Sequence, residues 1–500
     1  MEIDPLDAWR PWRPSAADPW GRKWAAHLYR RAAFGSSRQE LIEAERLGPE
    51  ATLNLLLHGR PEADELLATL TDIGSVVAGR DDDGTLLRGW WLYCMLQGGH
   101  PLREKMALFW HNHFATSIAK VQQPGLMFRQ NWLLRVHGLG KFATLLTAIS
   151  KDPAMLIWLD SNRNVSGRPN ENFARELMEL FTLGVGHYTE TDIREAARAF
   201  TGWRTDGEKF SFDSRLHDAG RKTVLGQAGN WQGDDILRIV LEQPVAASFL
   251  VRKLYRNFIS EEAEPPDSLL APLCDAFRKS EYDIAALVRT MLSSRHFFSE
   301  HAFRARIKNP VEFVLGAVQA IYRRFGEGEP DYRPLPQQAL VKWLAAIGQS
   351  LFAPPNVKGW PGGRSWLNTS TVLARDNFAT ALALGTLWSD QQSGPATATA
   401  SVGNTDTKPA GRGAQPAMPL EPAPPLAFDP ARLLSEEGVS SPEEIIRALL
   451  DLYVPGGVRS EERAALVVFV ADGKPAGPAL DRRMREAVHV ILTIPEYQLG

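Results

Sequence analysis

DPAMLIWLDSNRNVSGRPNENFARELMELFTLGVGHYTETDIREAARAFTGW, residues 152–203, is the stretch of this 500-residue chain that decides the predicted fold. Apolar side chains in its second half recur three and four positions apart, which is the period of an amphipathic helix. Asn170 can cap a helix that begins at about Glu171, and the glycines around Gly186 end it. Thr189, with an aspartate three residues later, or Thr191 then caps a second helix. The stretch therefore predicts two helices joined by a short turn.

One face of the first helix is charged, and we call it, with the turn that follows, the polar seam (residues 171–187). Helical spacing places two carboxylates and an arginine on one stripe, with a further carboxylate beside it. Paired carboxylates shift each other's pKa, an arginine binds anions, and a histidine moves protons near neutral pH. The pattern favours an acid/base or metal-dependent hydrolase or transferase acting on a sugar or a phosphorylated glycan. The predicted catalytic residues are Glu171, Arg175, Glu176, Glu179 and His187.

The same stripe also fits a structural role. Glu171, Arg175 and Glu179 are four residues apart, which is the spacing of ion pairs along a helix. In that interpretation the seam is a salt-bridge network, and the protein is a non-catalytic binding or scaffold protein. Both interpretations stay open at the level of the sequence.

At these residues the chain resembles a large bacterial family catalogued as a domain of unknown function, number 1800 in its series. The resemblance implies an α-helical bacterial protein and brings no established activity. Members of the family are often encoded beside a family related to sulfatases and alkaline phosphatases, so the resemblance implies such a hydrolase as the partner. Besides residues 169–203, it rests on HLYRRAAFG (27–35), MALFWHNHFATS (106–117), HDAGRKTVLGQAGNWQGDD (217–235) and PPNVKGWPGGRSWLN (354–368).

Composition describes an ordinary globular chain, with 44% hydrophobic and 23% charged residues. The formal net charge of −3 gives no basic footprint, which disfavours binding to nucleic acid. Two cysteines, Cys94 and Cys274, are too few for a thiolate metal site. The sequence has neither a membrane-spanning apolar run nor an export signal, which predicts a cytoplasmic protein. Export stays open, because a start codon assigned too late would hide a leader peptide.

His111 and His113 are the candidates for binding a metal. Two residues apart on a regular helix, they point about 200° from each other and cannot chelate one ion together. Zinc-binding helices use a spacing of four. One of the two can still face a site, so the cofactor stays unknown, with a divalent metal as the option that these residue types suit.

Candidate binding residues come from the loops. Residues 209–212 alternate like a strand, and residues 222–226 are the predicted partner in a small β-hairpin. The aromatic and amide side chains around it suit a carbohydrate ligand. The tryptophans of residues 354–368 either fill the core or line a cleft. The candidate binding residues are Asn170, Trp203, His217, Asp218, Lys358 and Trp360.

The predicted fold class is all-α, a multi-helix globular body with a small β-hairpin insertion and a linker-joined C-terminal helical unit. We expect an N-terminal extension (1–23) and a main domain (24–388) with its insertion at about 204–233. The proline-, alanine- and threonine-rich residues 389–425 predict a disordered linker. Residues 426–500 form the C-terminal unit, which we expect to dock on the main body because roughly 70 residues give only a thin core.

Overall fold

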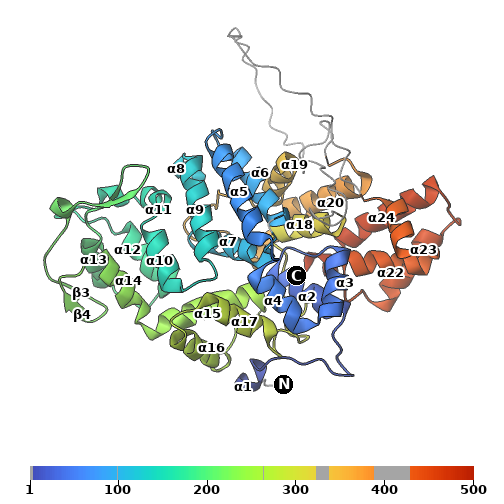
Figure 1. Ribbon diagram of the computed structural model, residues 1–500, viewed down its shortest axis with the longest axis horizontal. Helices are drawn as coiled ribbons and strands as arrows, with labels where there is room; N and C mark the ends of the chain where they lie inside the picture. Colours follow the sequence, from blue (N-terminus) through green and yellow to red (C-terminus); the bar gives the residue numbers. More distant parts are fainter. Residues whose placement is uncertain (1–3, 98, 263, 322–336, 388–427) are drawn as a thin grey trace, which may run out of the picture.

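The computed structural model describes residues 4–97, 99–262, 264–321, 337–387 and 428–500. Over these residues it is mostly helical, with two small two-stranded sheets (Figure 1). This confirms the predicted all-α fold class with a small β insertion. The predicted linker lies outside the described residues, and the domain boundaries stay predictions.

The first series of helices leads from the N-terminus to the central stretch. Proline stands at the first position of several of them, where its missing N–H costs nothing. The helices are α1 (Pro5–Ala8), α2 (Arg22–Ala32), α3 (Arg38–Leu47), α4 (Pro49–His58), α5 (Ala63–Ala78), α6 (Thr85–Gln97), α7 (Pro101–His113), α8 (Ile118–Val121), α9 (Pro124–His137), α10 (Phe142–Ser150) and α11 (Pro153–Trp158).

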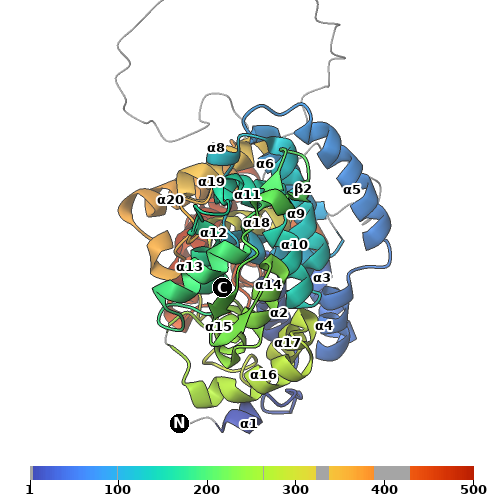
Figure 2. The same cartoon turned by 90° about the vertical axis from the view of Figure 1, so that its left-hand side faces the viewer.

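The central stretch and the helices after it form one end of the molecule. Figure 2 looks at this end and shows α15, α16 and α17 below α14. The helical elements are the 3-10 helix η1 (Ser161–Arg163), α12 (Asn172–Glu176), the π-helix η2 (Leu177–Thr182), α13 (Glu190–Ala199), the 3-10 helix η3 (Ser214–Leu216), α14 (Gly233–Leu241), α15 (Pro244–Phe258), α16 (Asp267–Lys279) and α17 (Ile284–Ser293).

The last series of helices forms the other end of the long axis (Figure 1). There α24 packs along α20, and His489 Nε2 lies 2.9 Å from Asp376 Oδ1 across the contact. The elements are α18 (Pro310–Ile321), α19 (Gln337–Ile347), the 3-10 helix η4 (Gly363–Trp366), α20 (Thr369–Leu384), α21 (Pro430–Glu437), α22 (Pro442–Tyr453), α23 (Ser460–Ala471), α24 (Pro478–Thr493) and α25 (Pro495–Gln498).

Helix α7 lies between two hydrophobic cores. It contributes Met106 and Trp110 to the first, which α10 and α12 to α17 share. It contributes Ala107 and Leu108 to the second, which α6, α18, α20, α22 and α24 share. A helix that is buried on every side sits at the centre of a large protein. The two halves of the molecule are therefore built around α7.

The strands of the insertion pair differently from the prediction. β1 (Trp203–Thr205) pairs with β2 (Phe210–Phe212), and β3 (Lys222–Val224) pairs with β4 (Gln227–Gly229), both antiparallel. The predicted pairing of residues 209–212 with residues 222–226 was wrong. Leu225 and Gly226 both have positive φ, as in a two-residue hairpin turn, and this turn folds β3 back onto the residues that follow it.

Within the described ranges, no helix is long and apolar enough to cross a lipid bilayer.

A buried ion pair joins α7 to α9. Arg135 donates from Nε and Nη2 to the two carboxylate oxygens of Glu104, at 2.5 and 2.8 Å, and both side chains are excluded from solvent. Trp91 Nε1 donates to the same carboxylate. The pair leaves neither charge unmatched inside the protein.

Replacement of Arg135 alone is expected to leave the buried Glu104 carboxylate without an ion-pair partner. Arg135→Met should lower the free energy of unfolding by about 3–5 kcal/mol, measured by urea denaturation followed by circular dichroism. The control, Arg238→Met, removes an exposed i,i+4 pair with Glu242 and should change it by less than about 0.5 kcal/mol. Equal effects of the two substitutions would contradict the assignment.

Candidate functional site

Part of the charged stripe of the polar seam forms ion pairs. Arg175 Nη2 donates to Glu171 Oε2 at 3.0 Å, as the four-residue spacing predicts. The same guanidinium makes two further hydrogen bonds of 2.8 Å to Glu190, in the first turn of α13. The hydrogen bonds to Glu190 are the largest cause of a raised pKa of Arg175, and the bond to Glu171 adds to it. The sequence analysis missed Glu190, because the folding of α13 beside α12 is what brings it there.

Glu179 does not join this network. The chain leaves α-helical geometry after Glu176 and continues as the π-helix η2. A π turn takes one more residue than an α turn, so the four-residue spacing of Arg175 and Glu179 no longer has the geometry of a regular α-helix. Its carboxylate instead accepts a hydrogen bond of 3.1 Å from Tyr188 Oη. Burial, and then this carboxylate, raise the pKa of Tyr188 to about 12.

Glu176 is half-buried beside Glu179. Burial, and next the neighbouring Glu179 carboxylate, raise its pKa, while Arg175 and Lys358 oppose the shift. Lys358 belongs to residues 354–368, so that loop reaches the seam. The structure therefore groups Glu176 with Glu179, Tyr188 and Lys358.

The predicted histidines do not join this group. His187 is exposed in the turn before α13. His113 is buried, where Nε2 lies 3.1 Å from Phe181 O and Nδ1 accepts from Lys253 Nζ at 3.0 Å. Burial, with Lys253 beside it, holds the pKa of His113 well below its usual range. Burial, and then Arg256, lower the pKa of Lys253 to about 7.

His111 lies among aromatic rings. It packs against Trp91, Phe352 and Trp360, and burial lowers its pKa to about 3. It thus faces a different environment from His113, as the two-residue spacing predicts. In the part of the chain that the structure describes, no cluster of three or more His, Cys, Asp or Glu side chains could hold a metal ion.

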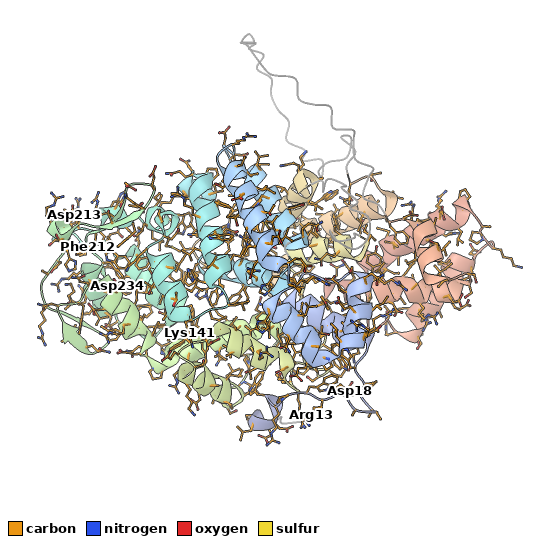
Figure 3. The ribbon with its side chains drawn as sticks, in the orientation of Figure 1. Arg13, Asp18, Lys141, Phe212, Asp213 and Asp234 are labelled. Carbon is orange, nitrogen blue, oxygen red and sulfur yellow. The ribbon has the colours of Figure 1, made fainter. Side chains whose placement is uncertain are left out.

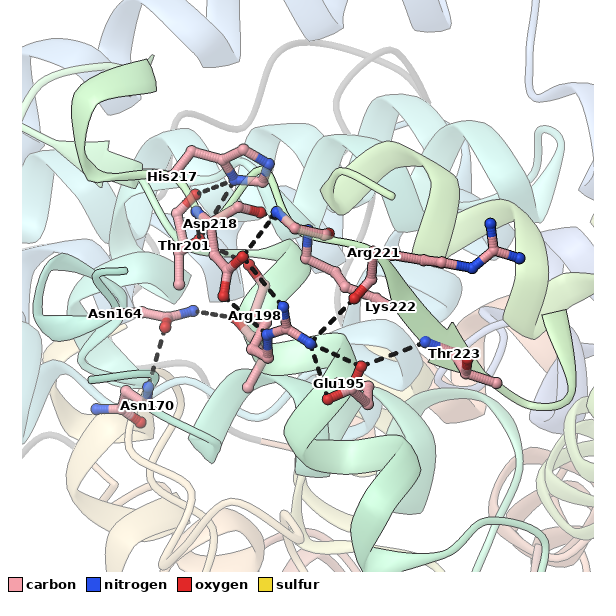
Figure 4. A network of polar contacts seen from close by, with 12 residues as sticks. Asn164, Asn170, Glu195, Arg198, Thr201, His217, Asp218, Arg221, Lys222 and Thr223 are labelled. Atoms are coloured by element: carbon pink, nitrogen blue, oxygen red, sulfur yellow. Dashed lines mark hydrogen bonds and ion pairs between the residues drawn. The ribbon is translucent and has the colours of Figure 1, made fainter. Parts of the chain in front are cut away.

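Asn170 and Trp203 have structural contacts. Asn170 Oδ1 accepts from the Asn172 backbone N–H at 3.0 Å, at the start of α12, and its own N–H donates to Asn164 Oδ1 (Figure 4). Trp203 is buried and packs edge-on against Phe200. Both residues serve the packing of the helix hairpin.

His217 and Asp218 belong to the network in Figure 4. Asp218 accepts from Arg198 Nε at 2.7 Å and from Nη2 at 3.1 Å, and its backbone N–H donates to Thr201 Oγ1 at 2.7 Å. His217 Nδ1 lies 3.0 Å from Thr201 O. Buried Lys222 donates to the backbone oxygens of Asp218 and Gly220. These bonds fasten the β insertion to α13.

The far side of the insertion is exposed. Figure 3 shows Phe212 and Asp213 at the outer end of the molecule, and more than a third of the Phe212 side chain is accessible to solvent. The candidate binding residues His217 and Asp218 are half-buried behind this edge.

Trp360 fills the core and also lines a small cavity with Trp366. Asn112 Oδ1 accepts the Trp360 N–H at 2.6 Å, which ties residues 354–368 to α7. The tryptophans are therefore buried, as one alternative predicts, while Lys358 and Arg364, the predicted partners in a cleft, are not among the residues that line this cavity. The binding role of Lys358 and Trp360 stays a prediction. The polar residues on the other walls of this cavity come from segments far apart in sequence, and the sequence analysis did not find them.

The comparisons with known proteins give one family. The model of the family described as protein of unknown function (DUF1800) matches residues 27–499, nearly the whole chain. No curated protein matches the chain, and no solved structure does.

Removal of the Asp218 charge is expected to loosen the insertion from α13. At pH 7, Asp218→Asn should speed amide hydrogen exchange in residues 217–224 roughly 10-fold, since a hydrogen bond to a charged group contributes about 1.5–3 kcal/mol. The measurement is hydrogen exchange followed by mass spectrometry. Glu208→Gln removes an exposed charge from the same insertion and should leave the exchange unchanged.

The pH dependence has a definite sign. Arg198 lowers the pKa of Asp218 from its ordinary 3.8 to about 2. The contribution of this carboxylate to stability is therefore complete above pH 3.8 and is lost as the pH falls through 2. Protection of residues 217–224, corrected for intrinsic exchange rates, that stays constant down to pH 2 would contradict the assignment.

Proposed function

This chain belongs to the family described as protein of unknown function (DUF1800), and we propose that it is a hydrolase or group transferase that uses acid/base chemistry at the polar seam. The observation that carries the proposal is the half-buried Glu176, whose carboxyl pKa is raised by burial and by Glu179. Two carboxyl groups in different environments are the arrangement that separates an acid from a base near neutral pH.

The two glutamates take different roles in this proposal. Glu176, the carboxyl with the raised pKa, donates a proton to the leaving group. Glu179, which accepts the hydrogen bond of Tyr188, acts as the base or nucleophile. Lys358 and Arg175 supply positive charge beside them. His187 is exposed next to this group and can exchange protons with solvent.

The substrate class that we propose is a sugar or a phosphorylated glycan. A partly exposed site with two carboxylates, a tyrosine and a lysine suits the cleavage or transfer of a bond between a sugar and its leaving group. The exposed aromatic edge of the β insertion gives a sugar ring a surface for stacking.

A second candidate function is a non-catalytic binding or scaffold protein that partners a sulfatase- or phosphatase-like hydrolase. The observation in its favour is the closed set of ion pairs around Arg175, which satisfies Glu171 and Glu190 without a ligand. In this case the seam stabilises the helix hairpin, and Glu179 contributes to packing through Tyr188.

Glutamine variants separate these two functions. If the seam is catalytic, Glu179→Gln should lower kcat by about 10²–10⁴-fold while the unfolding temperature stays near that of the wild type. Glu176→Gln should also lower kcat and should leave stability equal or higher at pH 7. Its raised pKa means that ionisation of Glu176 destabilises the folded state, and glutamine removes that cost. The assay is release of p-nitrophenol from p-nitrophenyl glycosides and p-nitrophenyl phosphate.

The matched control is Glu190→Gln, which removes an exposed carboxylate that pairs with Arg175 on the next helix. It should keep wild-type activity. Activity that survives Glu179→Gln, together with a lower unfolding temperature, would reject the enzyme and favour the scaffold protein.

A further inference from the structure

A cluster of buried charges lies where α2, α7 and α18 meet. The Glu312 carboxylate accepts hydrogen bonds from Lys105 Nζ and, at 3.3 Å, from Arg306 Nη1. It also accepts one of 3.0 Å from the Asn309 backbone N–H. Arg306 Nη2 lies 3.7 Å from Glu261 Oε1. We call this set, with Arg31, the interior ion cluster. Its charges are held away from bulk water, so each needs a partner nearby.

The interior ion cluster has more donors than the protein uses. Arg31 is fully buried and donates from Nη2 to Ala302 O, while its Nε and Nη1 have no partner among the described residues. Nε of Arg306 is likewise buried and unpaired within those residues. Burial, and next the Arg306 charge, hold the pKa of Arg31 well below its usual range. The named set holds three cationic side chains and two carboxylates, and the buried Lys308 adds positive charge near Glu312. Positive charge is therefore in excess here.

A cavity of about 80 Å³ opens on this cluster. Its volume is enough for a few water molecules or one tetrahedral oxyanion. The buried indoles of η4 and its preceding loop form one wall, and half-buried residues connect it with the surface. The lining includes Lys105, Asn257, Glu261, Arg306, Trp360 and Trp366.

Three buried polar atoms of the lining residues are unpaired within the described chain. They are two donors, Asn257 Nδ2 and Arg306 Nε, and one acceptor, Glu261 Oε2. Such atoms are costly to bury unless a ligand or water completes their hydrogen bonds. The combination of two donors and one carboxylate oxygen specifies which ligand fits.

Gly362 and Gly363 let the loop approach this carboxylate closely. Both have positive φ, and a Cβ on either would lie 3.7 or 3.9 Å from a carboxylate oxygen of Glu261. Other residues at these positions would be strained by the positive φ, although their Cβ atoms would be at ordinary van der Waals distance from the carboxylate. The glycines therefore let the loop follow this backbone path beside Glu261.

We propose that this cavity binds a phosphate group that still carries a proton. Arg306 Nε and Asn257 Nδ2 donate to its oxygens, and Glu261 Oε2 accepts from the P–OH group. The bound anion supplies the negative charge that the interior ion cluster lacks. A carboxylate repels an oxyanion that has no proton to donate, so the site selects phosphate or a phosphomonoester over sulfate.

The first test is isothermal titration calorimetry of the full chain with sodium phosphate and with sodium sulfate at pH 6.5. Phosphate is expected to bind with one site per chain, and sulfate at least about 100-fold more weakly. Glycerol 1-phosphate distinguishes the source of the group. If it binds in the same site while inorganic phosphate does not, the cavity recognises a phosphomonoester. The absence of binding by both would overturn the proposal.

Variants test the assigned contacts. Glu261→Gln should reduce the preference for phosphate over sulfate at least 10-fold, because the amide can donate to sulfate. Asn257→Ala should weaken phosphate binding about 10-fold. Glu262→Gln removes an exposed carboxylate one residue from the site. It should change neither the affinity for phosphate nor the preference for phosphate over sulfate. Thermal unfolding without ligand checks that each variant folds.

Sulfate binding as tight as phosphate, or an unchanged preference in folded Glu261→Gln, would overturn the assignment. The inference does not depend on the proposed acid/base chemistry, because Glu179→Gln, in the polar seam, should bind phosphate like the wild type.

Discussion

The carboxylate of Glu312 is the constraint on which the two halves of the molecule depend. It binds Lys105, 207 positions away in the sequence, and it lies beside α7, the helix that both hydrophobic cores share. Burial raises the pKa of this carboxyl group, but Arg306 and Lys105 outweigh it and bring the pKa to about 2. Glu312 therefore stays ionised across the physiological range. Loss of one partner from a buried ion pair is strongly destabilising, so the pair of Lys105 and Glu312 favours the arrangement of α7 and α18 that keeps it.

Local signals in the sequence predicted local structure well. The capping box at Thr189 and Asp192 is present, which decides between the two predicted caps, and Asn170 accepts a hydrogen bond at the start of α12. The spacing of Glu171 and Arg175 also gave the ion pair that forms between them. These features depend on residues a few positions apart, whose geometry follows from the helix itself.

The remaining features depend on contacts that no short window contains. Glu179, in the π turn after Glu176, accepts its hydrogen bond from Tyr188, which the sequence analysis did not pair with it. The pairing of β3 with β4 follows from a Leu-Gly turn, which lacks the usual asparagine or aspartate signal. Arg306 and Glu261 meet at a cavity that is also lined by residues of the loop 354–368, which comes much later in the sequence than either. The spacing of residues in the sequence does not predict such long-range contacts.

The polar seam and the cavity share one loop. Lys358 acts on the Glu176 carboxyl, while Trp360, two residues later, lines the cavity and donates its backbone N–H to Asn112 Oδ1. Asn112 is next to His113, whose ring contacts the backbone of Phe181 in η2. A displacement of this loop would therefore change the charge beside Glu176 and the wall of the cavity together.

The segment that carries Arg306 is held by residues almost two hundred positions later. Lys308 donates its N–H to Gln498 O, Gly500 donates to Arg306 O, and Tyr497 Oη donates to Phe313 O. During synthesis on a ribosome, these bonds form only after residues 497–500 have emerged. Until then α20 lacks its cover from α24, and the apolar face that packs on α24 in the folded protein is exposed to solvent.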